Sequence, residues 1–426
     1  MIWDAARRAS DAALRHFVAG IALLALAAYV AVYAFGLADR PIRSDAVSYY
    51  LYLPAWIIDG DPTFETESIA CCQGADLPGA RRWPANGRWI DPVPIGVAVL
   101  MLPFFAGADL LTRWSNMPRD GYSLYYQHFA GLAGVVYFLV GLAALRWYLR
   151  RHFSTGVTLA TLVTITFGTN LFHYGTYDST FSHAYSFCLI ALLVMLTERW
   201  WATPTTFDTI AIGVVSGLIV LTRHPNAIFL AIVPLYDLTR VRARVGAFAA
   251  IAGLGVACLA PQLLIYKQTT GQWLVNAYVG GGFTFGSPHL VDVLFSVKKG
   301  LFFWSPALLL AVFGLFVSRG AVRRWVLPAG VVVALHTYVV ASWHVWDYGG
   351  SYGHRAFTDG FALFAVFIAS AFAWASTRRR AKAIVSAATA AAIALSLFQM
   401  TQYWIGVIPT GGPTWPEYRA HFLRLR

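Results

Sequence analysis

The sequence predicts an all-α polytopic membrane protein with about eleven transmembrane helices. Of its 426 residues, 58% are hydrophobic and only 12% are charged, which is about half the charged fraction of an ordinary soluble domain. Apolar segments recur from residue 17 to residue 404, and most of them approach the roughly 17–25 residues that cross a bilayer. They leave no room for a separate soluble domain, so we expect residues 1–426 to form one transmembrane unit.

The net charge of +12 is explained by membrane topology rather than by nucleic-acid binding. The arginines are concentrated in short loops between apolar segments, as the positive-inside rule requires of cytoplasmic loops. The same loops would attract anionic lipid headgroups. We therefore expect membrane lipids as partners and no nucleic acid.

The first predicted span follows a basic segment that carries Arg7, Arg8 and Arg15. Its apolar run is too long for the core of a signal peptide, so we expect an uncleaved span and a cytoplasmic N-terminus. Two later spans are short and meet at Arg223, which predicts a hairpin whose turn lies below the outer surface. The predicted spans are 17–37, 127–148, 157–176, 181–201, 208–222, 226–238, 246–266, 301–317, 326–342, 357–375 and 382–404.

The apolar segment 95–111 decides the topology. Basic clusters follow the second, sixth, eighth and tenth predicted spans, and all four are cytoplasmic only if 95–111 does not cross the membrane. The prolines Pro94 and Pro103 also fit a segment that does not span. We therefore expect an interfacial or re-entrant helix within a long outer loop, 39–126, and an outer C-terminal tail, 406–426.

This topology brings polar and aromatic residues from five separate turns to the outer face. Ionisable groups at membrane depth are costly and usually functional, so this face is the predicted working site. Its candidate residues are Asp45, Tyr49, Asp178, His183, Arg223, His224, Lys298, Lys299, Trp343, Trp346, Tyr352, His354 and Arg355.

The residue types suggest transfer from a phosphorylated lipid. Basic side chains can hold a phosphate, while a carboxylate such as Asp45 or Asp178 takes the proton of an attacking hydroxyl. The expected phosphate or donor ligands are Arg223, Lys298, Lys299, Arg355, His183, His224 and His354. Aromatic side chains expected to stack on sugar rings are Tyr49, Trp343, Trp346 and Tyr352, and residues 302–304 are expected to line a groove for the lipid tail.

Plainer explanations stay open for the same residues. Asp45 and Asp178 each precede a predicted helix and could act only as its N-cap. The histidines could be ordinary interfacial side chains, and the aromatics could form an interfacial belt. Among the cysteines, Cys188 and Cys258 lie in apolar runs and are expected in the core, whereas the adjacent Cys71 and Cys72 could be a vicinal disulfide or two free thiols.

Several short motifs resemble the GT-C superfamily of polytopic glycosyltransferases, which use polyprenyl-phosphate-linked sugars. The nearest likeness is to bacterial relatives of the protein mannosyltransferases and of the lipid A aminoarabinose transferases. The motifs are YYLYLP at 49–54, SHAYSF at 182–187, KGLF at 299–302 and GGSYGHR at 349–355, and the likeness extends from about residue 20 to residue 370.

The resemblance implies a GT-C-like fold and an inverting transfer from an undecaprenyl- or decaprenyl-phosphate sugar to a glycan, lipid or protein acceptor. It implies Asp45 as the base and Asp178 as an aid to acceptor or metal binding. It also implies a bacterial cytoplasmic membrane with the site on the periplasmic side. Many members carry two close acidic residues in the first loop, whereas Asp45 stands alone and Asp59 and Asp61 lie a helix away. No cofactor is therefore certain, and the need for a divalent metal is left open.

The competing interpretation is a transporter or flippase for a lipid-linked or anionic substrate. Such a protein should carry polar groups along the whole crossing, whereas the predicted spans hold little beyond His336 in mid-membrane. No internal repeat is visible either, although transporter folds are often built from paired halves. Both observations favour an enzyme.

Overall fold

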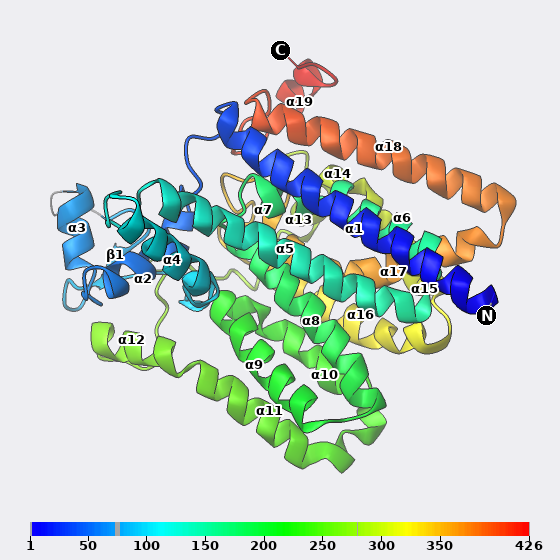
Figure 1. Cartoon of the computed structure of the whole chain (residues 1–426), viewed down its shortest axis with the longest axis horizontal. Helices are drawn as coiled ribbons and strands as arrows, with labels where there is room; N and C mark the ends of the chain where they lie inside the picture. The colour runs from blue at the N-terminus through cyan, green and yellow to red at the C-terminus, as the bar shows by residue number, and fades with distance from the viewer. Residues whose placement is uncertain (1, 73–76, 279, 426) are drawn as a thin grey trace.

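The computed structural model describes residues 2–72, 77–278 and 280–425. The chain is about 70% helical, and the one sheet among these residues is a short antiparallel hairpin. The longest helices are α1 (Ile2–Ala34), α5 (Leu124–His152) and α18 (Arg379–Trp404), which run side by side along the length of the molecule (Figure 1). The predicted all-α membrane class is confirmed at this level.

Among the described residues, six helical segments are long and apolar enough to cross a membrane, and a seventh candidate is a pair of helices bent by 41°. The predicted number of about eleven spans stays a prediction, because the other apolar helices are only 10–17 residues long. The six segments are α4 (Gly96–Trp114), α5, α8 (Ser182–Ala202), Gly320–Ala341, Arg355–Ser376 and α18, and the bent pair joins Arg242–Cys258 to Ala260–Thr270.

The remaining elements are short, and many are the pieces of broken spans. Those between α1 and α4 are α2 (Ala46–Ile57), α3 (Glu65–Cys72), β1 (Arg81–Arg82) and β2 (Trp89–Ile90). Those up to α12 are α6 (Thr155–Phe167), α7 (Leu171–Thr176), α9 (Thr206–Thr222), η1 (His224–Ala231), α10 (Ile232–Leu235), η2 (Leu238–Arg240), η3 (Arg242–Arg244), α11 (Val245–Cys258) and α12 (Ala260–Thr270). The rest are α13 (Leu290–Phe295), α14 (Leu301–Trp304), η4 (Pro306–Leu308), α15 (Leu309–Val317), η5 (Gly320–Trp325), α16 (Val326–Ala341), η6 (Arg355–Gly360), α17 (Phe361–Ser376) and α19 (Trp415–His421).

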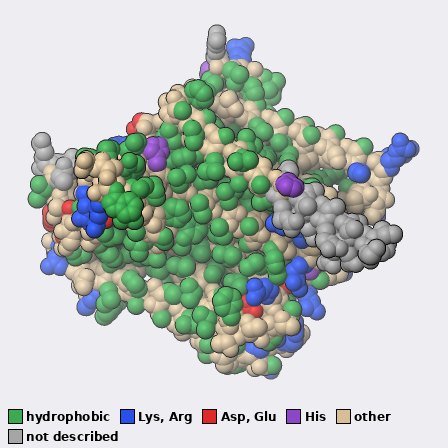
Figure 2. Space-filling view, viewed as in Figure 1, with side chains coloured by type: hydrophobic (Ala, Val, Ile, Leu, Met, Phe, Trp, Pro, Cys, Tyr) green, Lys and Arg blue, Asp and Glu red, His purple; other side chains and the backbone are tan. Residues whose placement is uncertain are grey.

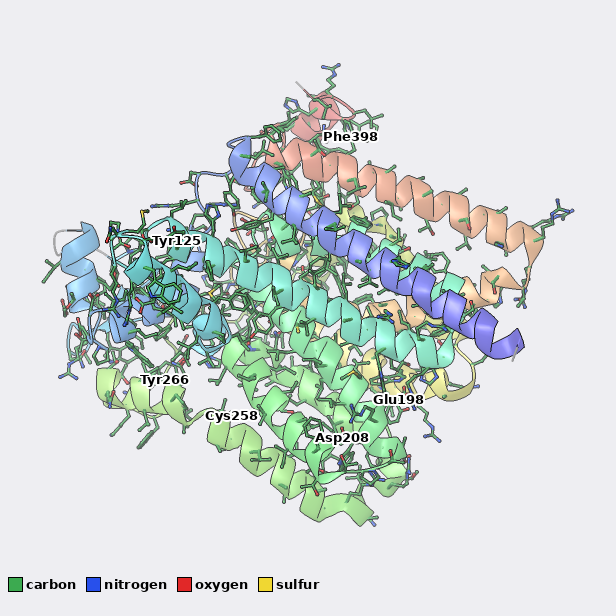
Figure 3. The ribbon with its side chains drawn as sticks, in the orientation of Figure 1. Tyr125, Glu198, Asp208, Cys258, Tyr266 and Phe398 are labelled. Carbon is green, nitrogen blue, oxygen red and sulfur yellow. The ribbon has the colours of Figure 1, made fainter. Side chains whose placement is uncertain are left out.

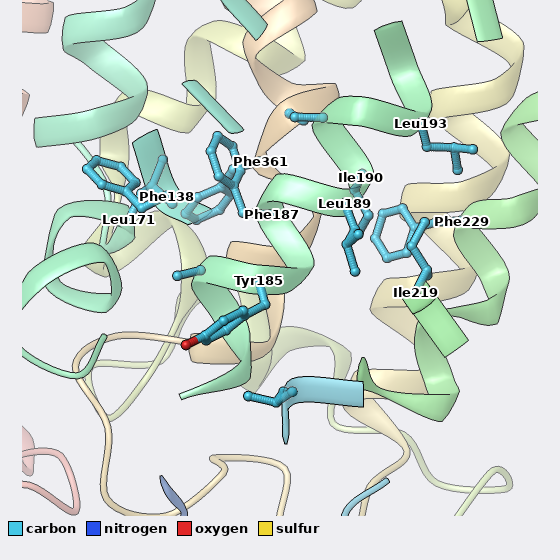
Figure 4. Packing of buried hydrophobic residues seen from close by; sticks show 14 of the residues in the cluster. Phe138, Leu171, Tyr185, Phe187, Leu189, Ile190, Leu193, Ile219, Phe229 and Phe361 are labelled. Atoms are coloured by element: carbon cyan, nitrogen blue, oxygen red, sulfur yellow. The ribbon is translucent and has the colours of Figure 1, made fainter. Parts of the chain in front are cut away.

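The core is built around α8 and α17, the two most deeply buried of the long helices. Small residues let neighbouring helices approach closely, as is usual in membrane bundles. A Cβ added at Gly141 of α5 would lie 2.7 Å from the ring of Phe187 in α8, and one at Gly314 of α15 would lie 1.8 Å from the carbonyl oxygen of Phe367 in α17. Figure 4 shows the resulting contact of Phe138, Phe187 and Phe361 in this core.

The basic loops gather at one end of the bundle, which we call the basic end. Arg151 in the last turn of α5 pairs with Glu198 of α8 at 3.2 Å, and Arg244 donates to the carbonyl of Trp200 at 2.8 Å. Trp325, beside the basic residues of η5, packs on Tyr148 of α5. The predicted sharing of one side by these loops therefore agrees with the packing, and Glu198 and Asp208 mark this end in Figure 3.

The opposite end carries a lobe made of residues 35–123, and we call it the lobe end. The end of α1 and the start of α5 both lie there, since Tyr33 packs on His128 with ring centroids 5.5 Å apart and the Ile42 amide donates to Gln127. Between the two ends, Figure 2 shows a broad hydrophobic surface with Lys and Arg near its margins. This distribution is the one that a bilayer requires.

Helix α4 packs along the first half of α5. The Tyr137 hydroxyl donates to the Leu100 carbonyl at 3.1 Å, and the Tyr126 hydroxyl donates to Asp109 at 2.7 Å. The helix ends at Trp114, three residues beyond the expected 95–111. An unpaired carboxylate at Asp109 would cost free energy at membrane depth, but Asp109 is paired with Arg113 and Arg119. The length of α4 also suits a span, so the interfacial or re-entrant assignment of this segment stays a prediction.

The predicted hairpin turn between 208–222 and 226–238 lies beneath the lobe. Helix α9 ends at Thr222, Arg223 adopts extended backbone (φ −155°, ψ 116°), and Pro225 follows in the first turn of η1. A Cβ added at Gly96, the first residue of α4, would lie 2.4 Å from the backbone of Leu221. The lobe therefore covers this turn.

The C-terminal tail returns to the same end, because the Ser351 amide donates to the Thr410 carbonyl at 3.1 Å. Cys188 is a buried free thiol and Cys258 a partly buried one, in agreement with the expected core positions. The side chains of Cys71 and Cys72 lie outside the described residues.

Candidate functional site

Asp45 is the first residue of the site along the chain, immediately before α2. Its side chain forms no capping hydrogen bond with that helix, so the explanation that it acts only as an N-cap is contradicted. Instead its Oδ2 accepts a hydrogen bond from Arg355 Nη1 at 2.6 Å. The Asp45 side chain is 44% exposed, whereas that of Arg355 is 13% exposed. A carboxylate held by a buried guanidinium therefore faces open space.

The loop that presents Asp45 is fixed on both sides. Ser44 has φ +51°, a left-handed conformation that costs a residue other than glycine about 1–2 kcal/mol. Just before it, Arg43 Nη2 bonds Asp178 Oδ1 at 2.7 Å. Strained backbone of this kind is found where the surrounding structure over-determines a functional position.

Asp178 is fully engaged by two partners. Burial alone would raise the pKa of Asp178, but the hydrogen bond from His173 and the charge of Arg43 lower it. Trp404 Nε1 donates to His173 Nδ1 at 2.8 Å, so the other nitrogen of His173, Nε2, carries the proton that it donates to Asp178 at 2.9 Å. Asp178 does not cap α8, whose N-cap residue is Phe181. In this structure it anchors Arg43.

A third acidic residue, Asp359, lies in η6 and is fully buried. Its Oδ2 accepts from Arg223 at 2.8 Å and from Asn226 at 2.9 Å, and His183 bonds Oδ1 at 2.9 Å. The sequence analysis missed Asp359. A signal was present, because it is the single acidic residue of the predicted span 357–375, and such residues are functional candidates by default.

The Asp45–Arg355 pair and the Asp359–Arg223 pair both lie near Tyr49. Tyr49 accepts a hydrogen bond from Ser182 Oγ at 3.0 Å, and it lies within electrostatic range of Asp45, Arg223 and Arg355. The Tyr348 ring lies 5.8 Å from the guanidinium carbon of Arg223. We call these five residues, Asp45, Tyr49, Arg223, Tyr348 and Arg355, the Asp45 cluster. It combines a partly exposed carboxylate with two arginines and two phenols.

The two predicted lysine ligands are occupied elsewhere. Lys299 is 1% exposed and donates to the carbonyls of Ser351 and Thr410, so that it fastens the C-terminal tail. Burial, followed by the charge of Arg355, lowers its pKa to about 7. Lys298 pairs with Asp347 at the surface. Neither lysine is brought into the Asp45 cluster.

The remaining predicted ligands are scattered around the cluster. His224 is exposed and packs near Tyr266, whereas His354 is 1% exposed and donates through Nε2 to the Trp346 carbonyl at 3.0 Å. Tyr352 is 1% exposed and its hydroxyl donates to Ser396. Its ring is enclosed by aromatic neighbours and offers no open face to a sugar; these neighbours are His173, Trp304 and Tyr403.

The predicted aromatic platforms have other partners as well. Trp343 packs on Phe283 and on Tyr278, and Trp346 lies parallel to His289. In the expected lipid groove, Trp304 is 2% exposed and Phe303 is covered by Trp415 and Tyr418 of α19. Residues 303 and 304 therefore pack against the tail in this structure.

The side chains at the site do not fit a shared metal ion. Among the described residues, no three His, Cys, Asp or Glu side chains are grouped as metal ligands. Asp45 and Asp178 are each bonded to a different arginine. We therefore assign no step to a metal.

Comparison with known proteins finds no matching family model, no matching curated protein and no matching solved structure. The chemistry of the site is the remaining guide to function. Its distinguishing feature is a partly exposed carboxylate with two arginines at the lobe end of an apolar helical bundle.

Proposed function

We propose that this protein transfers a sugar from a polyprenyl-phosphate carrier to an acceptor hydroxyl, with Asp45 as the general base. The observation that carries the proposal is the Asp45–Arg355 pair, in which a 44% exposed carboxylate is held by a buried arginine. The other two carboxylates of the site, Asp178 and Asp359, are no more than 7% exposed. Asp45 is therefore the carboxylate that an incoming hydroxyl can reach.

Arg355 and Arg223 are the proposed ligands of the carrier phosphate. Asp359 fixes Arg223 through Nη1, and Asp45 contacts Arg355 through Nη1. A phosphate that approaches the cluster would thus meet two guanidinium groups with fixed orientation, which favours charge-assisted and bidentate hydrogen bonds. Removal of one such donor from a developing anion typically costs roughly 3–4 kcal/mol of transition-state stabilisation.

The proposed chemistry is one displacement with inversion. The acceptor oxygen forms a bond to the anomeric carbon while the bond from that carbon to the phosphate oxygen breaks. The electron pair of the broken bond leaves with the phosphate, whose charge the arginines balance. The proton of the acceptor hydroxyl goes to Asp45.

The distribution of charge supports an enzyme over a transporter. In the part of the core that Figure 4 shows, hydrophobic side chains such as Phe138, Phe187 and Phe361 pack together. His336 packs between Phe229 and Phe357. It lies in the second half of α16, one to two turns before the helix ends at Ala341. A path for a polar substrate would need polar groups along the crossing.

The test is release of polyprenyl phosphate from a labelled polyprenyl-phosphate sugar by the purified protein in detergent. We expect Asp45→Asn to lower turnover by about 10²–10⁴-fold, because the general base is lost. The matched control is Asp39→Asn, since Asp39 lies in the same loop and its side chain is 71% exposed. Full turnover in Asp45→Asn would refute the base assignment. If the unmodified protein and Asp39→Asn both release no polyprenyl phosphate, the result favours the transporter.

A further inference from the structure

A pocket of about 230 Å³ opens at the surface of the lobe. One wall is the turn of the β hairpin, residues 83–85, and the other is the loop after α12, residues 276, 278 and 280. Side-chain contacts join the two segments, since Asn86 donates to the Thr269 carbonyl and Arg88 to that of Gln268. The volume is roughly that of eight water molecules, which is room for a single sugar ring.

The lining of this pocket is aromatic and uncharged: Trp83, Pro84, Ala85, Asn276, Tyr278 and Gly280. Aromatic faces carry negative partial charge, so they attract the C–H groups on the flat side of a sugar. Asn276 is fixed by two bonds, one from the Tyr278 amide and one to the Gly281 carbonyl. A phosphate would need cations that this lining lacks.

Two buried polar atoms near the pocket have no hydrogen-bond partner among the described residues. They are Trp83 Nε1 and Asp91 Oδ2. Asp91 is 1% exposed, and its other oxygen accepts from the Val93 amide at 2.9 Å. Ile90, next to Asp91, packs with Trp83 in one small apolar cluster. Both atoms are enclosed by protein, so a ligand in the pocket would meet the Trp83 ring rather than these atoms.

The pocket adjoins the Asp45 cluster through Tyr278. This side chain is 45% exposed, and it lies within electrostatic range of Tyr49, Arg223 and Asp45 on one side and of Asp91 on the other. Tyr278 is therefore the lining residue that connects the pocket electrostatically to the proposed base.

We propose that this pocket binds one ring of a saccharide acceptor and directs its reacting hydroxyl past Tyr278 towards Asp45. The inference rests on the proposed function and specifies its acceptor as a neutral glycan rather than a protein or an anionic lipid headgroup. The arginines then hold the donor phosphate, and the uncharged pocket holds the acceptor. The two substrates approach Asp45 from different sides.

Binding is tested without turnover, by saturation-transfer NMR of methyl hexopyranosides and methyl pentopyranosides with the whole protein in detergent. We expect at least one glycoside to bind, and Trp83→Ala and Tyr278→Ala each to weaken it by roughly two- to tenfold, as loss of an aromatic contact does. Trp83→Phe should retain most of the affinity, which separates stacking from misfolding. Trp114→Ala, at a 74% exposed tryptophan ending α4, should bind as the unmodified protein does.

The outcomes separate this inference from the proposed function. Glycoside binding that is absent, or that is indifferent to both Trp83→Ala and Tyr278→Ala, overturns the pocket assignment even if sugar transfer depends on Asp45. Binding that needs Trp83 and Tyr278 in a protein with no transferase activity supports the pocket and contradicts the transferase.

Discussion

Asp45 and Arg355 are 310 residues apart in sequence and 2.6 Å apart in the structure. Both were predicted as site residues from residue type and predicted membrane side, and the structure brings them together. Their pairing could not be predicted, because it depends on how η6 sits beside the loop after α1. The same reasoning placed Lys299 and Tyr352 in the site, where burial by the C-terminal tail and by neighbouring rings gives them other contacts.

At the residue scale, Asp359 provides a prediction about stability. Asp359→Asn should destabilise the protein by about 3–5 kcal/mol, because it leaves the buried charge of Arg223 without its counter-ion. Thermal unfolding in detergent measures this effect. The matched control is Asp292→Asn, whose exposed pair with His289 should change stability by less than about 0.5 kcal/mol.

A second substitution checks the physical cause. In the double variant Asp359→Asn with Arg223→Gln, the unpaired charge is absent, so we expect part of the lost stability to return. A double variant less stable than Asp359→Asn alone would show that the loss has another origin.

At the scale of elements, two predicted spans are broken helices in the structure. The predicted span 157–176 is split into α6 and α7 at Asn170, whose side chain bonds the Tyr352 carbonyl and the Thr358 hydroxyl. The predicted span 301–317 is split at Pro306, which begins η4. Proline gives a local signal, but the partners of Asn170 come from the far end of the chain, so no local pattern reveals that break.

The lobe helix α3 provides a prediction about pH. Glu67 is 3% exposed and accepts a hydrogen bond from the Tyr122 hydroxyl at 3.0 Å. Burial, followed by the charge of Asp59, raises its pKa to about 7 despite the bond from Tyr122. The folded lobe therefore keeps the proton of Glu67 up to about pH 7, whereas the unfolded chain releases it as pH rises through the ordinary Glu pKa of 4.5. Stability of the lobe should be highest below pH 4.5 with respect to this group and should fall as pH rises to about 7.

Glu67→Gln should abolish that dependence. Hydrogen exchange of the lobe amides between pH 5 and 8, corrected for intrinsic rates, measures it, and the substituted lobe should be the better protected at pH 8. Glu65→Gln is the control, because Glu65 lies in the same helix with a side chain that is 49% exposed. An unchanged pH profile in Glu67→Gln would contradict the raised pKa.

At the scale of the whole molecule, the sequence reasoning was strongest where it used the distribution of charge. The arginine loops were predicted to share one side, and contacts such as Arg151–Glu198 and Arg244–Trp200 bring them to one end. The number of spans was harder to predict, since several apolar segments form helices too short to cross alone. The free backbone N–H and C=O groups at the ends of these helices have to find partners in neighbouring elements, and a hydropathy profile does not reveal those partners.

The position of α4 decides the topology of the whole chain and can be tested directly. The first part of the lobe precedes α4, and α5 begins at the lobe end, where α1 also ends. If α4 does not cross the membrane, Arg88 before it and Asn116 after it lie on one side. In a background without the four native cysteines, Arg88→Cys and Asn116→Cys should therefore both react with an impermeant maleimide on intact cells. Arg379→Cys at the basic end should react only after the membrane is opened. Labelling of Arg88→Cys and Asn116→Cys from opposite sides would show that α4 is a span. The basic loops would then lie outside, which contradicts the positive-inside rule from which the sidedness of the site was inferred.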